Sequence, residues 1–170
     1  MKKALVVIDM QNDFIDGALA NPDAQAIVRP IAQAVLQFDG DLFATRDTHA
    51  ESYLQTPEGK LLPVAHCIKN THGWEIADEI ATALKNRSAT VIDKPTFGNL
   101  AWQPLADYDE ITLVGTCTDI CVVSNALILK ALYPNAKIAV DGTLCAGTTK
   151  SNHDAALQVM RCCQVEILEK

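Results

Sequence analysis

Apolar runs alternate with amphipathic stretches along most of this chain. Residues 4–8 form a continuous aliphatic run, which is the pattern of a strand covered on both faces of a parallel sheet. Comparable short runs follow at intervals along the sequence, at residues 41–45, 89–93, 110–115, 137–140 and 165–168. The pattern therefore predicts six strands.

Between these runs, apolar residues recur at helical spacing. The first long helix is predicted to begin at Asn21, with Asn21 as its cap and Pro22 at its first position, and to end before Gly40. Further helices are predicted over residues 74–86, 118–132 and 149–163. Strands that alternate with helices predict an α/β fold: a three-layer doubly wound sandwich with a mostly parallel six-stranded sheet.

Length, charge and cysteine content narrow the class of protein. The 170 residues suit a single domain spanning 1–170. A net charge of −7 argues against a nucleic-acid surface, and no apolar run is long enough to cross a membrane. The six cysteines lie mostly in apolar segments, as reduced thiols of a cytoplasmic protein do. We therefore expect no disulfides, no nucleic-acid partner and no membrane partner.

Polar residues follow several of the predicted strands directly. Asp9 ends the first strand, Asp47 and His49 follow the second, Lys94 follows the third, and Cys121 opens the helix after the fourth. Parallel sheets carry their sites in the loops beyond the carboxyl ends of the strands. The five side chains are therefore predicted to converge on one edge of the sheet.

Three of these residues suggest nucleophilic catalysis. Thr118 is a candidate helix cap, so that Cys121 would lie in the first turn, where the helix end and a nearby ammonium lower the pKa of a thiol from about 8.5. Asp9 could accept the thiol proton as a general base, and Lys94 could stabilise both anions. Asp13 fits better as a residue that organises the loop by accepting backbone N–H bonds. On position alone Cys121 fits a buried core residue equally well, and its partners favour catalysis.

Asp47, Thr48 and His49 place a carboxylate and an imidazole two residues apart, and His66 lies in the same long loop. One carboxylate with two histidines leaves positions open for water or substrate, as in catalytic zinc sites. Spacing of this kind is weak by itself, because loop histidines are commonly just solvated.

Three ordered motifs carry a resemblance to a known family. They are Asp9-x-Gln11-Asn12-Asp13-Phe14, Lys94, and Gly115-x-x-Thr118-Asp119-x-Cys121-Val122. Together they resemble the isochorismatase-like cysteine hydrolase superfamily, and most closely its metal-containing nicotinamidase-like members. The resemblance implies a catalytic triad of Asp9, Lys94 and Cys121, a thioester acyl-enzyme, and a cis peptide between Thr116 and Cys117. It also implies an oxyanion hole made by the backbone N–H groups of Cys117 and Cys121.

The same resemblance implies a divalent metal ion, zinc or else iron or manganese, which holds water and the substrate's ring nitrogen. Its ligands would be Asp47, His49 and His66, with Glu58 as a fourth. The expected reaction is amide hydrolysis, of nicotinamide to nicotinate and ammonia, in a homo-oligomer. Apolar walls for the substrate are expected from three aromatic residues: Phe14, Phe97 and Trp102.

Some residues depart from the nicotinamidase pattern and leave alternatives open. Residues 62–65 lack the aromatic side chain that commonly precedes the metal-binding histidine, so another small amide, a ureide or a carbamoyl compound is a second candidate substrate. A non-catalytic binding module is a third hypothesis. A dinucleotide-binding dehydrogenase is disfavoured, because residues 9–13 are bulky and acidic where a glycine-rich turn is required. Cys67 is the expected secondary oxidation-sensitive thiol, and His72 and His153 are expected on the surface.

Overall fold

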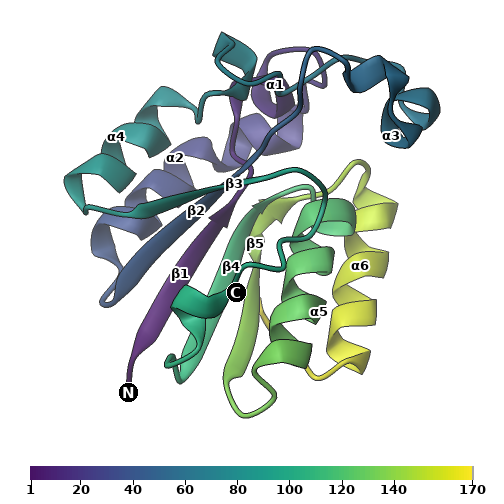
Figure 1. The fold of residues 1–170 in the computed structure, drawn as a ribbon. Coiled ribbons are helices and arrows are strands. Elements are labelled where there is room, and N and C mark those ends of the chain that lie inside the picture. Colours follow the sequence, from purple (N-terminus) through teal and green to yellow (C-terminus); the bar gives the residue numbers. More distant parts are fainter. Residues whose placement is uncertain (170) are drawn as a thin grey trace.

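A six-stranded sheet forms the centre of the computed structural model, which describes residues 1–169 (Figure 1). The strands are β1 (Lys3–Ile8), β2 (Asp41–Asp47), β3 (Thr90–Lys94), β4 (Glu110–Thr116), β5 (Lys137–Ala146) and β6 (Glu166–Leu168). Their order in the sheet is β3-β2-β1-β4-β5-β6, and each neighbouring pair is parallel. The predicted α/β fold is confirmed, and the sheet is parallel throughout.

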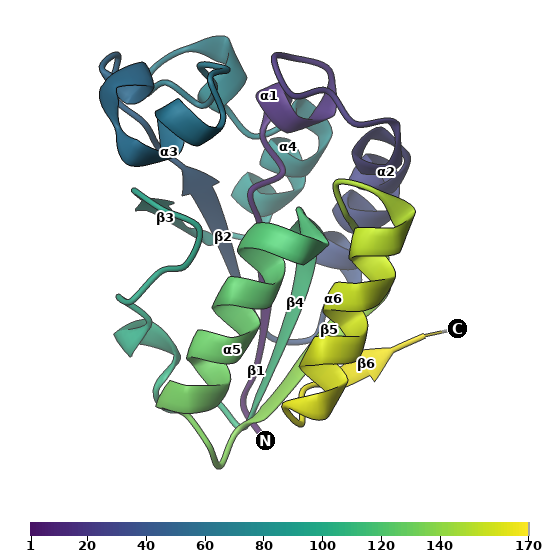
Figure 2. The same ribbon diagram turned by 90° about the vertical axis from the view of Figure 1, so that its right-hand side faces the viewer.

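Helices cover both faces of the sheet. They are α1 (Asn12–Ile15), α2 (Pro22–Gln37), α3 (Pro57–Leu61), α4 (Asp78–Asn86), α5 (Val123–Leu132) and α6 (Lys150–Cys162). Helices α2 and α4 pack on one face, and α5 and α6 pack on the other (Figures 1 and 2). None of the helices in the described part of the chain has the length and apolar character needed to span a lipid bilayer.

The central strand β1 is apolar from Ala4 to Ile8 because both of its faces are buried. Ala4, Val6 and Ile8 belong to the hydrophobic core beneath α5 and α6, whereas Leu5 and Val7 belong to the core beneath α2 and α4. Alternate side chains of a strand point to opposite faces, so burial on both faces requires an apolar residue at every position.

The chain reverses direction across the sheet between β1 and β4. From β1 it adds β2 and β3 on one side, and from β4 it adds β5 and β6 on the other. The carboxyl ends of β1 and β4 therefore lie at a topological switch point, where ligands bind in open α/β sheets. Asp9 and the turn that leads to Cys121 follow these two strand ends.

Three element boundaries differ by more than two residues from those predicted. The helix expected from residue 74 begins at Asp78, because Ile76 forms an isolated bridge with Gln11 and Trp74 lies in a 3₁₀ turn. Strand β5 runs to Ala146 rather than to residue 140, with a register shift where it passes β4. The helix expected from residue 118 starts as a π-helical turn, Thr118–Val122, before α5.

Candidate active site

Asp9 is the first residue after β1, and its side chain is fully buried. Its φ of 46° lies in the left-handed region, which residues other than glycine adopt rarely and mostly where the surroundings hold them. The hydroxyl of Thr45, on β2, donates to Asp9 Oδ1 at 2.6 Å and accepts from the Asp9 backbone N–H at 3.2 Å. The carboxylate is thus fixed at the edge of the sheet by the neighbouring strand.

Lys94 ends β3 and is fully buried, although lysine is rarely buried without a partner. Its Nζ lies 2.6 Å from Asp9 Oδ2 and 3.6 Å from Cys121 Sγ. It lies 3.5 Å from Asp47 Oδ1 and donates to the backbone carbonyl of Thr96 at 3.0 Å. One ammonium group therefore contacts three of the four other side chains that the sequence placed at this edge, and His49 is the one that it does not contact.

The turn that carries Cys121 depends on a glycine. Gly115 has φ of +118°, and a Cβ atom built there would lie 2.1 Å from the backbone oxygen of Ile8 in β1. A side chain at residue 115 would separate the two central strands. The peptide that follows, Thr116–Cys117, is cis, as the family resemblance implied.

The prediction that Thr118 caps the helix is wrong. Cys117 occupies the N-cap position without a side-chain capping bond, and Thr118 lies inside the π-helical turn with Cys121. The hydroxyl of Thr118 instead forms a hydrogen bond with His153 Nδ1 at 2.8 Å. His153 was expected on the surface, but it is half-buried and ties α6 to the turn that carries Cys121.

The expected lowering of the Cys121 pKa is also not what the structure gives. Cys121 is 4% exposed, and burial raises the pKa of its thiol well above the ordinary value. The charge of Asp9 raises this pKa further, and the Lys94 ammonium opposes both effects. Burial therefore favours the neutral thiol of Cys121, which only a nearby base could ionise.

Asp9 is suited to be that base. Burial raises the pKa of its carboxyl, and the Lys94 ammonium opposes this shift. Within the described residues, Asp9 Oδ2 has no partner with hydrogen-bond geometry, although it is in ion-pair contact with Lys94. A buried acceptor with an unfilled position can take up a proton.

A second cluster of ligand-type side chains lies beside this group. One ligand atom from each of four residues lies within 4.8 Å of the others: Asp47, His49, Glu58 and His66. Asp47 Oδ2 is 2.9 Å from His49 Nε2 and 3.7 Å from His66 Nε2, and Glu58 Oε1 is 3.6 Å from His49 Nε2. The cluster unites the four residues that were predicted as metal ligands.

The donor set fits a divalent cation. Burial opposes ionisation of Asp47, yet hydrogen bonds from His49 and His66 hold the pKa of its carboxyl below the usual range. His66 Nδ1 lies 2.8 Å from the backbone oxygen of Val64, which leaves Nε2 facing Asp47. Second-shell bonds of this kind orient histidine ligands in metal sites.

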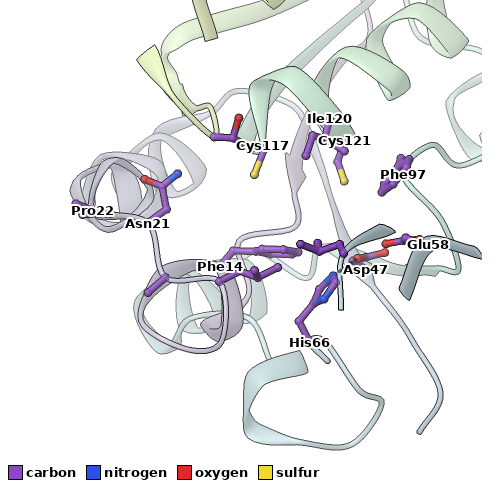
Figure 3. Close-up of a pocket in the computed structure, with 14 residues that line it drawn as sticks. Phe14, Asn21, Pro22, Asp47, Glu58, His66, Phe97, Cys117, Ile120 and Cys121 are labelled. Carbon is purple, nitrogen blue, oxygen red and sulfur yellow. Dashed lines mark ion pairs between the residues drawn. The ribbon is translucent and has the colours of Figure 1, made fainter. Parts of the chain in front are cut away.

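The two clusters border one cavity of about 390 Å³ (Figure 3). Phe14 and Phe97 line it, as expected of substrate walls. Trp102 does not line it: this side chain is fully buried, donates to Asn125 Oδ1 at 3.3 Å, and belongs to the core beneath α5. The predicted substrate contact of Trp102 is therefore corrected to a packing role.

Cys67 also differs from its expected role. It is fully buried, and burial raises the pKa of its thiol strongly, so it is poorly placed for oxidation. All six cysteines are free thiols, as predicted. Asp13 organises its loop as predicted, because its carboxylate accepts from the backbone N–H groups of Ala18 and Cys67.

Sequence reasoning gave no role to Gln11 or to Asn125, both of which hold the site in place. The side chain of Gln11 donates to the backbone oxygen of Asp47 at 2.8 Å and accepts from the backbone N–H of Asp47 at 2.7 Å, as the backbone of a neighbouring strand would. Asn125 donates to the backbone oxygen of Cys121 at 2.8 Å and to that of Phe97 at 3.0 Å. The sequence does distinguish Asn125, because it is a polar residue in a mostly apolar helix, one turn after Cys121.

Comparisons with known proteins agree with this geometry. The isochorismatase domain model matches residues 3–169. The nicotinamidase of Saccharomyces cerevisiae is 26% identical over 189 residues, covering 83% of this chain and 87% of the yeast protein. A nicotinamidase/pyrazinamidase structure from Bacillus subtilis superposes with a TM-score of 0.88 at 25% identity, over 99% of this chain and all of that one. A pyrazinamidase of Pyrococcus horikoshii, solved in complex with zinc, has the same fold, with a TM-score of 0.81 at 23% identity over the full length of both chains.

Proposed function

Because the chain belongs to the isochorismatase domain family, we propose that it is a cysteine-dependent amidase that hydrolyses nicotinamide to nicotinate and ammonia. The observation that carries the proposal is the contact of Lys94 Nζ with Asp9 Oδ2 at 2.6 Å and with Cys121 Sγ at 3.6 Å, beside the cavity. The names of the yeast and Bacillus subtilis relatives support nicotinamide as the substrate. Nothing comparable favours a ureide substrate or a non-catalytic binding module.

The first half of the reaction forms a thioester. Asp9 Oδ2 accepts the thiol proton of Cys121, and the thiolate attacks the carbonyl carbon of the amide. The negative charge moves to the carbonyl oxygen in a tetrahedral intermediate. When this intermediate collapses, the C–N bond breaks, Asp9 returns the proton to the leaving nitrogen, and ammonia departs.

The second half releases the acid. Water enters where ammonia left, Asp9 accepts a proton from it, and the resulting hydroxide attacks the thioester carbonyl. The C–S bond then breaks, and the sulfur recovers the proton. Throughout both halves, Lys94 keeps its positive charge beside whichever of Asp9 and Cys121 is anionic, since the charges of both anions raise the pKa of its ammonium.

Backbone N–H groups of Cys117 and Cys121 are proposed to receive the oxyanion. Cys117 follows the end of β4 and lines the cavity together with Cys121. Among the hydrogen bonds of residues 1–169, none is donated by the backbone N–H of Cys117. A free donor aimed at a developing negative charge contributes about 3–4 kcal/mol of transition-state stabilisation in comparable hydrolases.

A divalent ion, zinc in the first instance with iron or manganese as alternatives, is proposed to bind Asp47, His49, Glu58 and His66. When bound, such an ion supplies a Lewis-acidic position for water or a ring nitrogen. Phe14 and Phe97 are proposed to flank the substrate ring. We also propose that the protein is one domain that functions as a cytoplasmic homo-oligomer, which gel filtration and cell fractionation would test.

An ammonia-release assay tests the proposed function. The wild-type protein should release ammonia from nicotinamide, and Cys121→Ala should release none while retaining its circular dichroism spectrum. The panel should include pyrazinamide, carbamoyl compounds and ureides, each with and without a chelator, so that substrate class and metal requirement are measured together. Normal ammonia release by Cys121→Ala would contradict the proposal.

A further inference from the structure

The cavity extends well beyond the two reactive clusters. In Figure 3, Asn21 and Pro22 lie on the far side of Phe14 from Asp47 and His66. We call this end of the cavity the distal lobe. Besides Asn21 and Pro22 it is lined by Leu19 and Ala20, which precede Asn21 in the chain, and by Thr148, which follows the Gly147 that Asn21 contacts. None of these residues belongs to the proposed triad or to the metal-ligand group.

The size of the cavity exceeds the needs of a single-ring amide. Its volume of about 390 Å³ falls within the range of roughly 300–1,000 Å³ that holds drug-sized ligands. A pyridine ring with one carboxamide group is far smaller than such a ligand. If its reacting carbon lies at Cys121, the ring leaves the distal lobe unfilled.

Hydrogen bonds within the protein occupy the polar side chains of the distal lobe. Asn21 donates through Nδ2 to the backbone oxygen of Gly147 at 2.8 Å and accepts the Asp23 N–H through Oδ1 at 2.9 Å. The Thr148 hydroxyl donates to Asp119 at 2.5 Å and accepts from Asn152 at 2.9 Å. Since these groups are already paired, they gain little from a polar ligand, and the lobe is complementary to an apolar one.

Charge also restricts what the distal lobe can hold. Within residues 1–169, no lysine or arginine lines the cavity, and the acidic side chains that line it are Asp47 and Glu58. The chain as a whole carries a net charge of −7. A carboxylate placed in the distal lobe would lose hydration without gaining a lysine or arginine partner there, which is costly.

From these observations we propose that the enzyme acts on neutral aromatic amides that carry an apolar ring substituent, and that the distal lobe binds this substituent. The inference rests on the proposed function, because it takes the amide to be held at Cys121. It separates this chain from hydrolases of anionic carbamoyl compounds, and it assigns selectivity to Leu19, Ala20 and Pro22.

Binding to the inactive Cys121→Ala variant, measured by calorimetry, tests the lobe without requiring turnover. The ligands are nicotinamide and a series that carries one propyl group on each free ring carbon in turn. At least one isomer should bind about tenfold or more tightly than nicotinamide, as burial of two or three methylene groups predicts. Equal or weaker binding of every isomer would overturn the proposal.

A matched anionic ligand tests the charge restriction. Replacing the propyl group of the tightest isomer with a carboxyethyl group should weaken binding at least tenfold, and undiminished binding would overturn that part of the proposal. Turnover of nicotinamide by the wild-type protein is read separately. Absence of ammonia release with the propyl preference intact would refute the proposed function alone, whereas ammonia release without the preference would refute only the inference.

A pair of variants locates the effect. Ala18 and Ala20 are both exposed, but Ala20 lines the distal lobe and Ala18 does not line the cavity. In the Cys121→Ala background, Ala20→Leu should reduce the preference for the propyl isomer over nicotinamide at least fivefold, because the added side chain fills the lobe. Ala18→Leu should leave this preference unchanged. An unchanged preference in Ala20→Leu would contradict the assignment.

Discussion

Two regions supply the polar groups of the cavity, and they are held in different ways. The proposed triad follows strand ends, where the sheet register itself brings Asp47 opposite Lys94 and Ile8 opposite Gly115. The metal-ligand residues after β2 lie on segment 48–77, which has little regular structure. Backbone ladders fix the first region, whereas the second is fixed by side-chain hydrogen bonds together with one short backbone bridge between His49 and Ile68.

The stretch after β1 joins the two regions. Gln11 donates to the backbone oxygen of Trp74, Asn12 donates to that of His72, and Asp13 accepts from the backbone N–H of Cys67. Trp74 in turn donates to the hydroxyl of Thr48. The polar residues that follow Asp9 in the motif thus anchor the loop, while Asp9 itself contacts the nucleophile's partner, Lys94. One short motif therefore combines a chemical residue with structural ones.

The largest expected effect comes from removing the base on the strand-end side. Asp9→Asn should lower kcat for nicotinamide by about 10⁴-fold, because the amide cannot accept the thiol proton. The fold should survive, since Thr45 can still donate to the side-chain oxygen at residue 9, and Lys94 keeps its hydrogen bond to the backbone oxygen of Thr96. Timed assays of ammonia release measure kcat, and circular dichroism at 25 °C tests whether the fold is retained. The exposed variant Asp16→Asn serves as the matched control and should be fully active.

A second variant breaks the backbone register itself. Gly115→Ala places a methyl group 2.1 Å from the Ile8 carbonyl oxygen and forces a left-handed φ on alanine, so the free energy of unfolding should fall by about 3–5 kcal/mol. Gly142→Ala is the control, because its nearest neighbour is the flexible end of Leu157 at 3.1 Å. Urea unfolding compares the two, and equal stability of both variants would show that the central strands tolerate separation.

A third variant loosens the loop and spares the strand ends. Asp13→Ala leaves the Cys67 N–H without its acceptor, so stability should fall by about 1–3 kcal/mol. Because His66 is the adjacent residue, metal affinity should fall about 10- to 100-fold. Competition with a chromophoric chelator measures the affinity, and Asp16→Ala is the control. Retention of wild-type affinity by Asp13→Ala would mean that the loop is held without this carboxylate.

The smallest effect is expected at the opposite edge of the sheet. Burial and the hydrogen bond to Asp41 raise the pKa of Tyr108 to about 12, against about 10 in an unfolded chain. The fold thus favours the neutral phenol, and its stabilisation is complete below pH about 10 and is lost as the pH rises toward 12. Tyr108→Phe should cost about 1–2 kcal/mol at pH near 8 and less at pH near 11, with kcat unchanged. A pH-independent difference in urea unfolding would contradict this assignment.

Much of the strand-end region could be predicted from the sequence, and much less of the loop. The aliphatic run before Asp9 and the glycine before Thr116 are visible in the local sequence. In a parallel sheet the carboxyl ends of the strands lie at the same edge, so the residues that follow these two strands are predicted to lie close together. The contacts of Gln11 and Asn12 with residues 72–74 join segments far apart in the chain, and no periodic pattern in the sequence predicts them. Tyr53, whose ring lies 4.6 Å from that of His49 and 4.9 Å from that of His66, likewise left no signal. Burial of Cys121 reversed the expected direction of its pKa, because local helix position does not reveal desolvation.

Lys94 gives the site an evolutionary constraint. Its ammonium contacts Asp9 and Cys121 of the hydrolytic group and Asp47 of the neighbouring ligand cluster. Groups that share a partner do not contribute additively, so substitutions in the two clusters should show epistasis that a double-mutant cycle can detect. Selection or engineering that changes the proposed ion-binding residues would therefore alter the surroundings of Cys121 as well.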